Sequence, residues 1–206
     1  GIVITEKQAK TLNSRRSGFQ KANNYKILLD KTWEAGDVLQ LKELAATLRR
    51  IQVNGRDEFY KGQTAALMVN YLEELGGIIT MDDLAAYNAV WRTPVNFEYK
   101  NHTITSMTLP SSGGVLLEQM LRTLEDYDVE SLGHNTKKYM QLLTEVERRS
   151  YADRAQFLGD SDFINVQADA LTNKSYLRSR MKDFSWNNAN SSSNIQHGNP
   201  YNVESE

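Results

Sequence analysis

The sequence predicts a helix-rich α+β fold, and three observations support this class. Apolar residues recur at helical spacing in several segments, of which 39–53 and 136–157 are the clearest. Alternating apolar and polar residues predict one β-hairpin within 95–107. A strand, a tight turn and a helix start then follow one another over 106–115. Helical segments outnumber strands, so we expect little sheet in this chain.

The first half of the chain contains further helical segments and one short strand. Helices are predicted over 5–14 and 64–75, a single helical turn over 57–62, and the strand over 27–29. The two longest helices of this half each carry an apolar stripe, which is expected to face a core. The stripes are Leu41, Leu44, Ala45, Leu48 and Ile51, and Leu67, Met68, Tyr71, Leu72 and Leu75.

Capping signals place two helix starts in the rest of the chain. Thr80 and Asp83 form an approximate capping box, because the hydroxyl and the carboxylate each satisfy an early amide. A last helix is predicted to begin at Thr172, which Leu171 and Tyr176 bracket as a hydrophobic staple.

The turn that contains Ser111, Ser112, Gly113 and Gly114 is the main candidate site. Either serine hydroxyl can cap the amides of the helix that follows, and the glycines allow another backbone or a ligand to come close. Two interpretations stay open: a structural turn at a crowded packing point, or a turn near a bound ligand such as an anion. A serine nucleophile is not favoured, because the turn lacks the Gly-x-Ser-x-Gly pattern and a nearby base.

Composition excludes several classes of site. The formal net charge is -2, which gives no electrostatic reason to expect nucleic acid as a partner. The chain has no cysteine, so it has no disulfide and no thiolate ligand, and it has no apolar run long enough to cross a membrane. His102, His134 and His197 stand in turn-like sequence without ligand spacing, and Asp160 with Asp162 lacks further ligands. We therefore expect no metal and no cofactor.

Charged residues on the helix over 136–157 are spaced for ion pairs. Glu145 and Arg149 are four residues apart, as are Arg149 and Asp153. Such pairs stabilise a helix by roughly 0.2–0.5 kcal/mol each, so we interpret them as structural.

The polar character of the end of the chain predicts two regions. Residues 1–183 are expected to form one α+β domain that is incomplete at its N-terminal side, and 184–206 a polar, mobile tail. The stretch 187–194 is almost free of apolar side chains, so burial cannot hold it in place.

Three blocks of sequence together resemble the γ-glutamyltranspeptidase family, in the later part of its large subunit. They are GGIITMDDLAAYNAVWRTPV at 76–95, SMTLPSSGGVLLEQML at 106–121 and EVERRSYADRAQFLGDSDF at 145–163. In this family a proline-rich run usually precedes the two serines, whereas here only Pro110 does.

The resemblance implies a fold and an activity. The fold is part of an N-terminal-nucleophile hydrolase αββα sandwich, which a small subunit from the same precursor completes. The activity is transfer of the γ-glutamyl group of glutathione and related amides to water or amino acids, through an acyl-enzyme on a threonine of the small subunit. The resemblance also implies a periplasmic or extracellular location and no cofactor.

The resemblance places no catalytic residue in this chain. The family's threonine belongs to the small subunit, and its substrate-binding arginine would lie upstream of Gly1. The stretch that ends at Glu206 resembles the end of the large subunit, so Glu206 would supply the carbonyl of the bond cut in self-processing. An arbitrary boundary at Glu206 is the alternative.

Two other functions remain open. A related acylase that acts on β-lactam side chains shares the architecture and the processing. The chain could also be a structural or interaction module without chemistry of its own.

Overall fold

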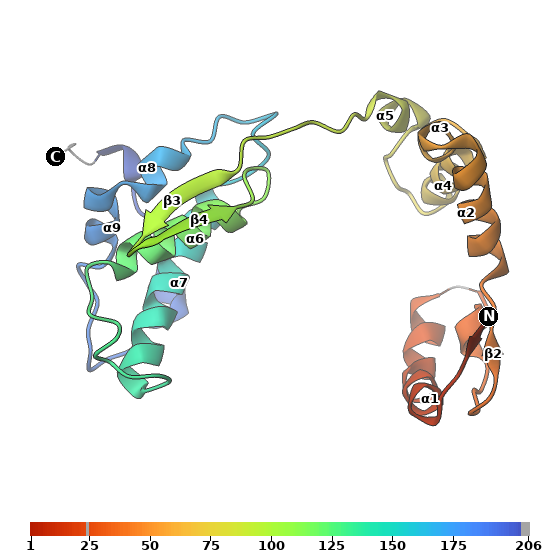
Figure 1. Ribbon diagram of the computed structural model, residues 1–206, viewed down its shortest axis with the longest axis horizontal. Coiled ribbons are helices and arrows are strands. Elements are labelled where there is room, and N and C mark those ends of the chain that lie inside the picture. The colour runs from red at the N-terminus through yellow and green to blue at the C-terminus, as the bar shows by residue number, and fades with distance from the viewer. Residues whose placement is uncertain (24, 203–206) are drawn as a thin grey trace. The chain divides into compact units, whose positions relative to one another are not determined.

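The computed structural model describes residues 1–23 and 25–202 (Figure 1). The chain forms two compact units, and the boundary in sequence falls between Ala89 and Val90. This division differs from the single domain expected over 1–183, and it falls within 87–94, a stretch without helix or strand. Helices predominate, so the helix-rich α+β class is confirmed.

The first unit is built from helices and one two-stranded antiparallel sheet, in which β1 pairs with β2. Its small core contains Ile4, Ala9 and Trp33. Its elements are β1 (Ile2–Val3), α1 (Glu6–Ala22), the 3-10 turn η1 (Leu28–Asp30), β2 (Val38–Leu39), α2 (Lys42–Asn54), α3 (Arg56–Tyr60), α4 (Gln63–Glu74) and α5 (Met81–Ala86).

Two local predictions in this unit need correction. Helix α1 continues eight residues beyond the expected end at Ser14, because the arginine, lysine and glutamine residues that follow favour helix without an apolar stripe. The expected strand at 27–29 is instead η1, in which the carboxylate of Asp30 accepts a hydrogen bond from the Ile27 amide at 3.0 Å. That side-chain bond gives the backbone an alternative to strand pairing.

A buried carboxylate joins three helices of the first unit. Glu58 of α3 accepts hydrogen bonds from Arg50 of α2 at 2.9 Å and from the amide of Thr64 in α4 at 3.0 Å. The Thr64 amide is one of the unpaired donors at the start of α4, so Glu58 caps that helix from outside it.

The predicted capping box at Thr80 is confirmed, since the Thr80 hydroxyl accepts from the Asp83 amide and the Asp83 carboxylate accepts from the Thr80 amide.

The expected core faces of α2 and α4 are exposed. Leu48 is 56% exposed and Leu67 is also 56% exposed, and α2 has no buried residue. The expectation that these stripes face a core is therefore wrong for the described residues, in which Ala45, Ile51, Met68 and Leu72 are half-buried and the larger part of each stripe is exposed.

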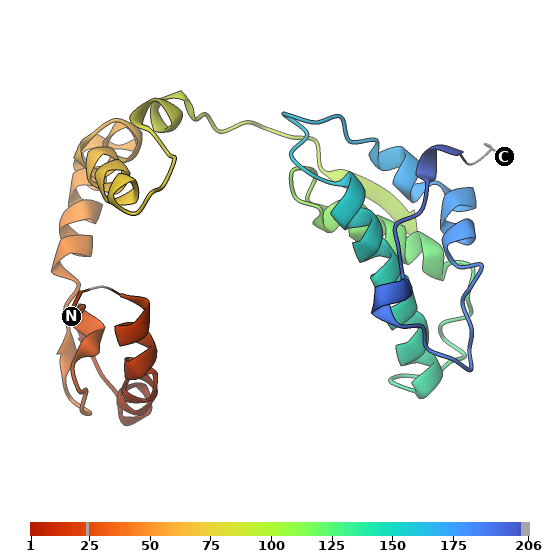
Figure 2. The ribbon, with the colours of Figure 1, turned by 180° about the vertical axis from the view of Figure 1, so that it is seen from behind.

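The second unit packs helices against one β-hairpin. Strands β3 and β4 pair antiparallel with Phe97 opposite Ile104, as the alternation predicts. Helix α6 contacts the hairpin and also α7, α8 and α9 (Figure 2). The elements are β3 (Val95–Tyr99), β4 (His102–Ser106), α6 (Gly113–Leu124), α7 (Lys137–Phe157), α8 (Ala168–Thr172), α9 (Lys174–Arg180) and the 3-10 turns η2 (Ser192–Asn194) and η3 (Pro200–Asn202).

The predicted last helix is divided in two. Helix α8 ends at Thr172, and α9 begins after Asn173, whose side chain accepts a hydrogen bond from the Tyr176 amide at 3.2 Å. Asn173 is therefore the N-cap, not Thr172. Leu171 and Tyr176 still lie in one buried cluster, together with Val115 and Leu177.

Within the described residues, no helix is both long and apolar enough to span a membrane.

Candidate functional site

The turn before α6 is crowded at Gly114 and open at Gly113. The Gly114 amide donates to the carbonyl of Met107 at 3.1 Å, and a Cβ atom at Gly114 would lie 2.1 Å from that oxygen. At Gly113 the nearest atom to such a Cβ would be the Ser111 hydroxyl at 3.5 Å. The close approach of two backbones therefore requires glycine only at Gly114.

The two serines have different partners. The Ser111 hydroxyl accepts from the Gly113 amide at 3.3 Å and so caps the first turn of α6. The Ser112 hydroxyl accepts from Nε of Arg154 in α7 at 2.8 Å. An arginine stays protonated and has no acceptor, so it cannot activate a serine as a base would. These contacts favour the structural interpretation of the turn, and a nearby ligand stays a prediction.

The other predicted site residue is Glu206, which lies outside the described residues. Its role as the carbonyl of a cleaved bond stays a prediction.

The charged residues of α7 form buried contacts, not the surface pairs that their spacing indicates. The expected pair of Glu145 with Arg149 is present, and Arg148 also binds Glu145 at 2.7 Å. Arg149 also forms an ion pair with Asp183 at 2.6 Å, and its guanidinium holds the pKa of the Asp183 carboxyl below its usual range. The expected pair of Arg149 with Asp153 does not appear among the ion pairs of the described residues.

Asp153 is instead the centre of a buried polar cluster between α7, α6 and α9. It is fully buried, and one carboxylate oxygen accepts from the Tyr176 hydroxyl and the Gln119 amide, each at 2.8 Å. The other oxygen accepts from the Gly198 amide at 3.0 Å and lies 3.1 Å from a guanidinium nitrogen of Arg180. Burial, and then the hydrogen bond to Asp153, raise the pKa of the Tyr176 hydroxyl, so this group keeps its proton and donates.

Sequence reasoning missed this cluster, although the spacing contained a signal for it. Leu142, Val146, Arg149 and Asp153 recur at intervals of three or four residues, so they share one face of α7. That face is buried. A charged residue on a buried face requires partners from neighbouring elements, which an intrahelical pair does not supply.

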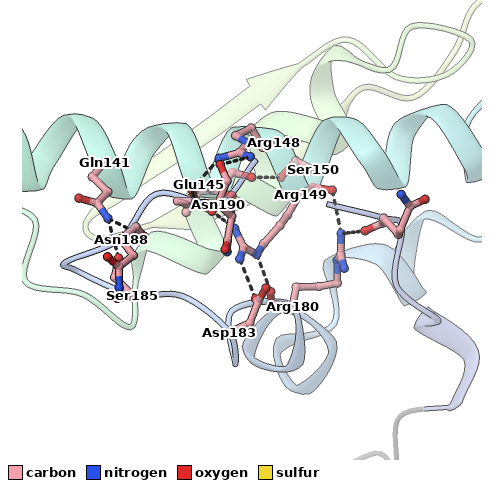
Figure 3. A network of polar contacts seen from close by, with 12 residues as sticks. Gln141, Glu145, Arg148, Arg149, Ser150, Arg180, Asp183, Ser185, Asn188 and Asn190 are labelled. Carbon is pink, nitrogen blue, oxygen red and sulfur yellow. Dashed lines mark hydrogen bonds and ion pairs between the residues drawn. The ribbon is translucent and has the colours of Figure 1, made fainter. Parts of the chain in front are cut away.

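The segment after α9 lies against α7 through its main chain (Figure 3). The Gln141 side chain donates to the carbonyl of Ser185 at 2.6 Å, and Arg148 donates to the carbonyl of Asn190 at 2.6 Å. The Asn190 amide in turn donates to Glu145 at 3.3 Å. The sequence predicts that 187–194 lacks apolar anchors, but it does not predict these polar contacts. The mobility of this segment stays a prediction.

Comparison of this chain with known proteins identifies the family to which it belongs. The family model described as gamma-glutamyltranspeptidase matches residues 1–206. The glutathione hydrolase proenzyme of Escherichia coli K12 is 44% identical over 202 residues, covering 96% of this chain and 35% of that protein. The Pseudomonas aeruginosa protein of the same name is 42% identical, covering 71% of this chain and 27% of its own length. The chain thus spans about a third of the length of these relatives or less.

Solved structures agree with the sequence comparison. A Helicobacter pylori gamma-glutamyltranspeptidase superposes with a TM-score of 0.81 at 37% identity, over 96% of this chain and 58% of that chain. A cephalosporin acylase from Bacillus halodurans has a TM-score of 0.76 at 18% identity, over 90% of this chain and 36% of that one, which indicates a shared fold only. The fold is that of the N-terminal-nucleophile hydrolases. Within that class, the chain belongs to the gamma-glutamyltranspeptidase family.

Proposed function

We propose that this chain is part of the large subunit of a γ-glutamyltranspeptidase, or glutathione hydrolase. The observation that carries the proposal is the family match along the whole chain, together with 44% identity to a protein named glutathione hydrolase proenzyme. In this proposal the complete protein takes the γ-glutamyl group from glutathione or a related amide and passes it to water or an amino acid. It works in the periplasm or outside the cell.

The proposed chemistry uses a second chain. A threonine at the N-terminus of the small subunit attacks the γ-glutamyl carbonyl, and its own α-amine takes the proton. The amine of the substrate leaves, and water or an acceptor amine then attacks the acyl-enzyme. The present chain contributes scaffold to a sandwich that the small subunit completes, and the turn at 111–114 is assigned a structural role within it.

Both chains are proposed to come from one precursor that cuts itself after Glu206. Support comes from the relatives, several of which are named proenzymes. A full-length precursor should give two bands on a denaturing gel, and replacing the residue after Glu206 with Ala should leave one. If that variant still splits at the same bond, a separate protease makes the cut.

An acylase that acts on β-lactam side chains is the second candidate, because a protein named acylase ACY 1 proenzyme is 35% identical over 150 residues. The complete protein should be assayed on a chromogenic γ-glutamyl anilide and on an acylated β-lactam. We expect turnover of the anilide. Turnover of the β-lactam alone would support the acylase, and turnover of neither would support a module without chemistry.

A further inference from the structure

The rings of Phe184 and Trp186 pack against the core cluster of Leu124, Leu142, Val146 and Met181. Beyond them, hydrogen bonds from α7 and α9 hold the segment 187–198 at two places, and these bonds are to its main chain. At the first place, Glu145 and Arg148 of α7 bind main-chain atoms of Asn190 (Figure 3). Because the side chains of the segment are not the partners in these bonds, its composition gives no hint of them. The anchors lie on the helix.

The second place is the Asp153 cluster. Asp153 accepts from the Gly198 amide at 3.0 Å, and Arg180, which pairs with Asp153, donates to the carbonyl of Gln196 at 2.8 Å. One buried ion pair therefore binds the main chain on both sides of His197. Charge-assisted bonds of this kind are stronger than neutral ones, and truncating one partner leaves the other charge buried without compensation.

Steric fit at this place is as restrictive as the hydrogen bonding. A Cβ atom at Gly198 would lie 2.5 Å from the Tyr176 hydroxyl oxygen and 2.6 Å from Cδ of Arg180. The segment can therefore lie this close to α9 only because residue 198 is glycine. The ring of Phe157 also contacts His197 and Tyr201 edge-on, at centroid distances of 5.3 and 5.8 Å.

We propose that Asp153, Tyr176 and Arg180 are positioning residues for the cut that matures the precursor. They fix the main chain at Gly198 and, together with the contact of Phe157 with Tyr201, they fix the part of the chain that leads to the processed bond. Glu206 follows Gly198 by eight positions, so the chain between them can span at most about 27 Å. The hydroxyl of the residue after Glu206 must meet the adjacent carbonyl in a bent local chain, and a fixed point upstream limits the directions from which the chain can enter that bend. This inference rests on the proposed self-cleavage after Glu206.

Gly198→Ala in the full-length precursor tests the proposal with the least disturbance of the core. The added methyl displaces the segment from Tyr176 and Arg180, and we expect self-cleavage, followed on a denaturing gel, to slow at least tenfold. Gly18→Ala is the matched control, because a Cβ atom there meets nothing within 4 Å, and it should cut at the wild-type rate. Asn190→Ala should also cut at the wild-type rate, since the segment is bound through its main chain.

Asp153→Asn provides a second variant. The side-chain NH2 of the new asparagine is a donor, and it must face one of the donors on Gln119, Tyr176, Arg180 or Gly198, so a hydrogen bond is lost. We therefore expect slower cutting and faster hydrogen exchange of the Gly198 amide. Phe97→Leu separates positioning from loss of stability, because Phe97 is buried in β3. It should lower the unfolding temperature while folded precursor still cuts at the wild-type rate.

The outcomes separate this inference from the proposal on which it rests. If Gly198→Ala and Asp153→Asn fold and cut at the wild-type rate, Asp153 has no positioning role, although self-cleavage stands. If Phe97→Leu slows cutting as much as these two variants do, the effect is general destabilisation and the positioning role is also overturned. A wild-type precursor that stays whole contradicts self-cleavage itself, and the positioning role with it.

Discussion

Single residues decide how closely the elements of the second unit approach one another. Gly114 lets the start of α6 contact the backbone at Met107, and Asp153 joins α7 to α6 and α9 through a buried carboxylate. Both residues lie in buried positions. Each is therefore sensitive to substitutions that would be harmless on an exposed helix.

The contrast between Gly114 and Gly113 gives a stability prediction. Gly114→Ala should lower the free energy of unfolding by about 1–3 kcal/mol, because the backbone must move away from Met107. Gly113→Ala should leave it unchanged or raise it by up to about 1 kcal/mol, since the site is open and alanine restricts the unfolded chain. Urea unfolding of both variants measures the difference, and equal losses would contradict the assigned packing.

The sequence indicated that a glycine near residue 113 was needed, but not which one. Adjacent residues at a helix start point in different directions, and only the position of the Met107 backbone, just after β4, decides which direction is blocked. The role of Asp153 was hidden for a related reason. The sequence shows Arg149 four residues before Asp153, but the actual partners Tyr176, Arg180 and Gly198 come from distant parts of the chain.

At the scale of elements, helix ends are the features that side chains control most directly. Helix α9 starts at Lys174 because Asn173 caps it, whereas the sequence suggested a start at Thr172. Both residue types are good N-caps, so the pattern alone could not choose between neighbours. The existence of every long predicted helix is confirmed, and the errors lie at the boundaries.

Replacing the two candidate caps tests this assignment. Asn173→Ala should cost about 1 kcal/mol, because it leaves the Tyr176 amide without its acceptor. Thr172→Ala should cost less, since the hydroxyl makes only long bonds of 3.4 and 3.5 Å within α8. Thermal unfolding compares the two, and a larger loss for Thr172→Ala would return the cap to that residue.

Helix α4 depends on the charge of Glu58, which predicts a dependence on pH. The Thr64 hydroxyl bond, opposed by burial, and the bond from Arg50 lower the pKa of the Glu58 carboxyl. A carboxyl with a lowered pKa in the folded state stabilises the fold above its unfolded pKa of about 4.3. That stabilisation is lost as the pH falls through the folded value.

Unfolding temperatures from pH 7 to pH 3 test this prediction. The wild type should lose stability below about pH 4.3, whereas Glu58→Gln should be less stable at pH 7 and lose less on acidification. Glu73→Gln, at an exposed position of α4, should follow the wild type. An acid loss of the same size in Glu58→Gln would show that other carboxyls cause it.

At the scale of the whole molecule, the first unit shows that apolar faces alone do not locate a core. The sequence predicts that the apolar stripes on α2 and α4 face a core, yet Leu44, Leu48, Leu67 and Tyr71 are exposed in the described chain. A helical pattern identifies which side is apolar, but it does not say which part of a protein covers that side. This chain spans only 35% of its Escherichia coli relative, so most of the sequence of such a protein lies outside the part that matches this chain.

We propose that this chain belongs to a γ-glutamyl transferase whose reacting groups lie outside it. The most direct measurement is turnover of a chromogenic γ-glutamyl anilide by the complete protein and by the purified 206-residue chain, side by side. We predict that the complete protein releases the anilide and that the 206-residue chain releases none, because the proposed nucleophile belongs to the small subunit and the proposed substrate arginine to another part of the large subunit. Release by the uncontaminated 206-residue chain, or no release by the complete and processed protein, would contradict the account.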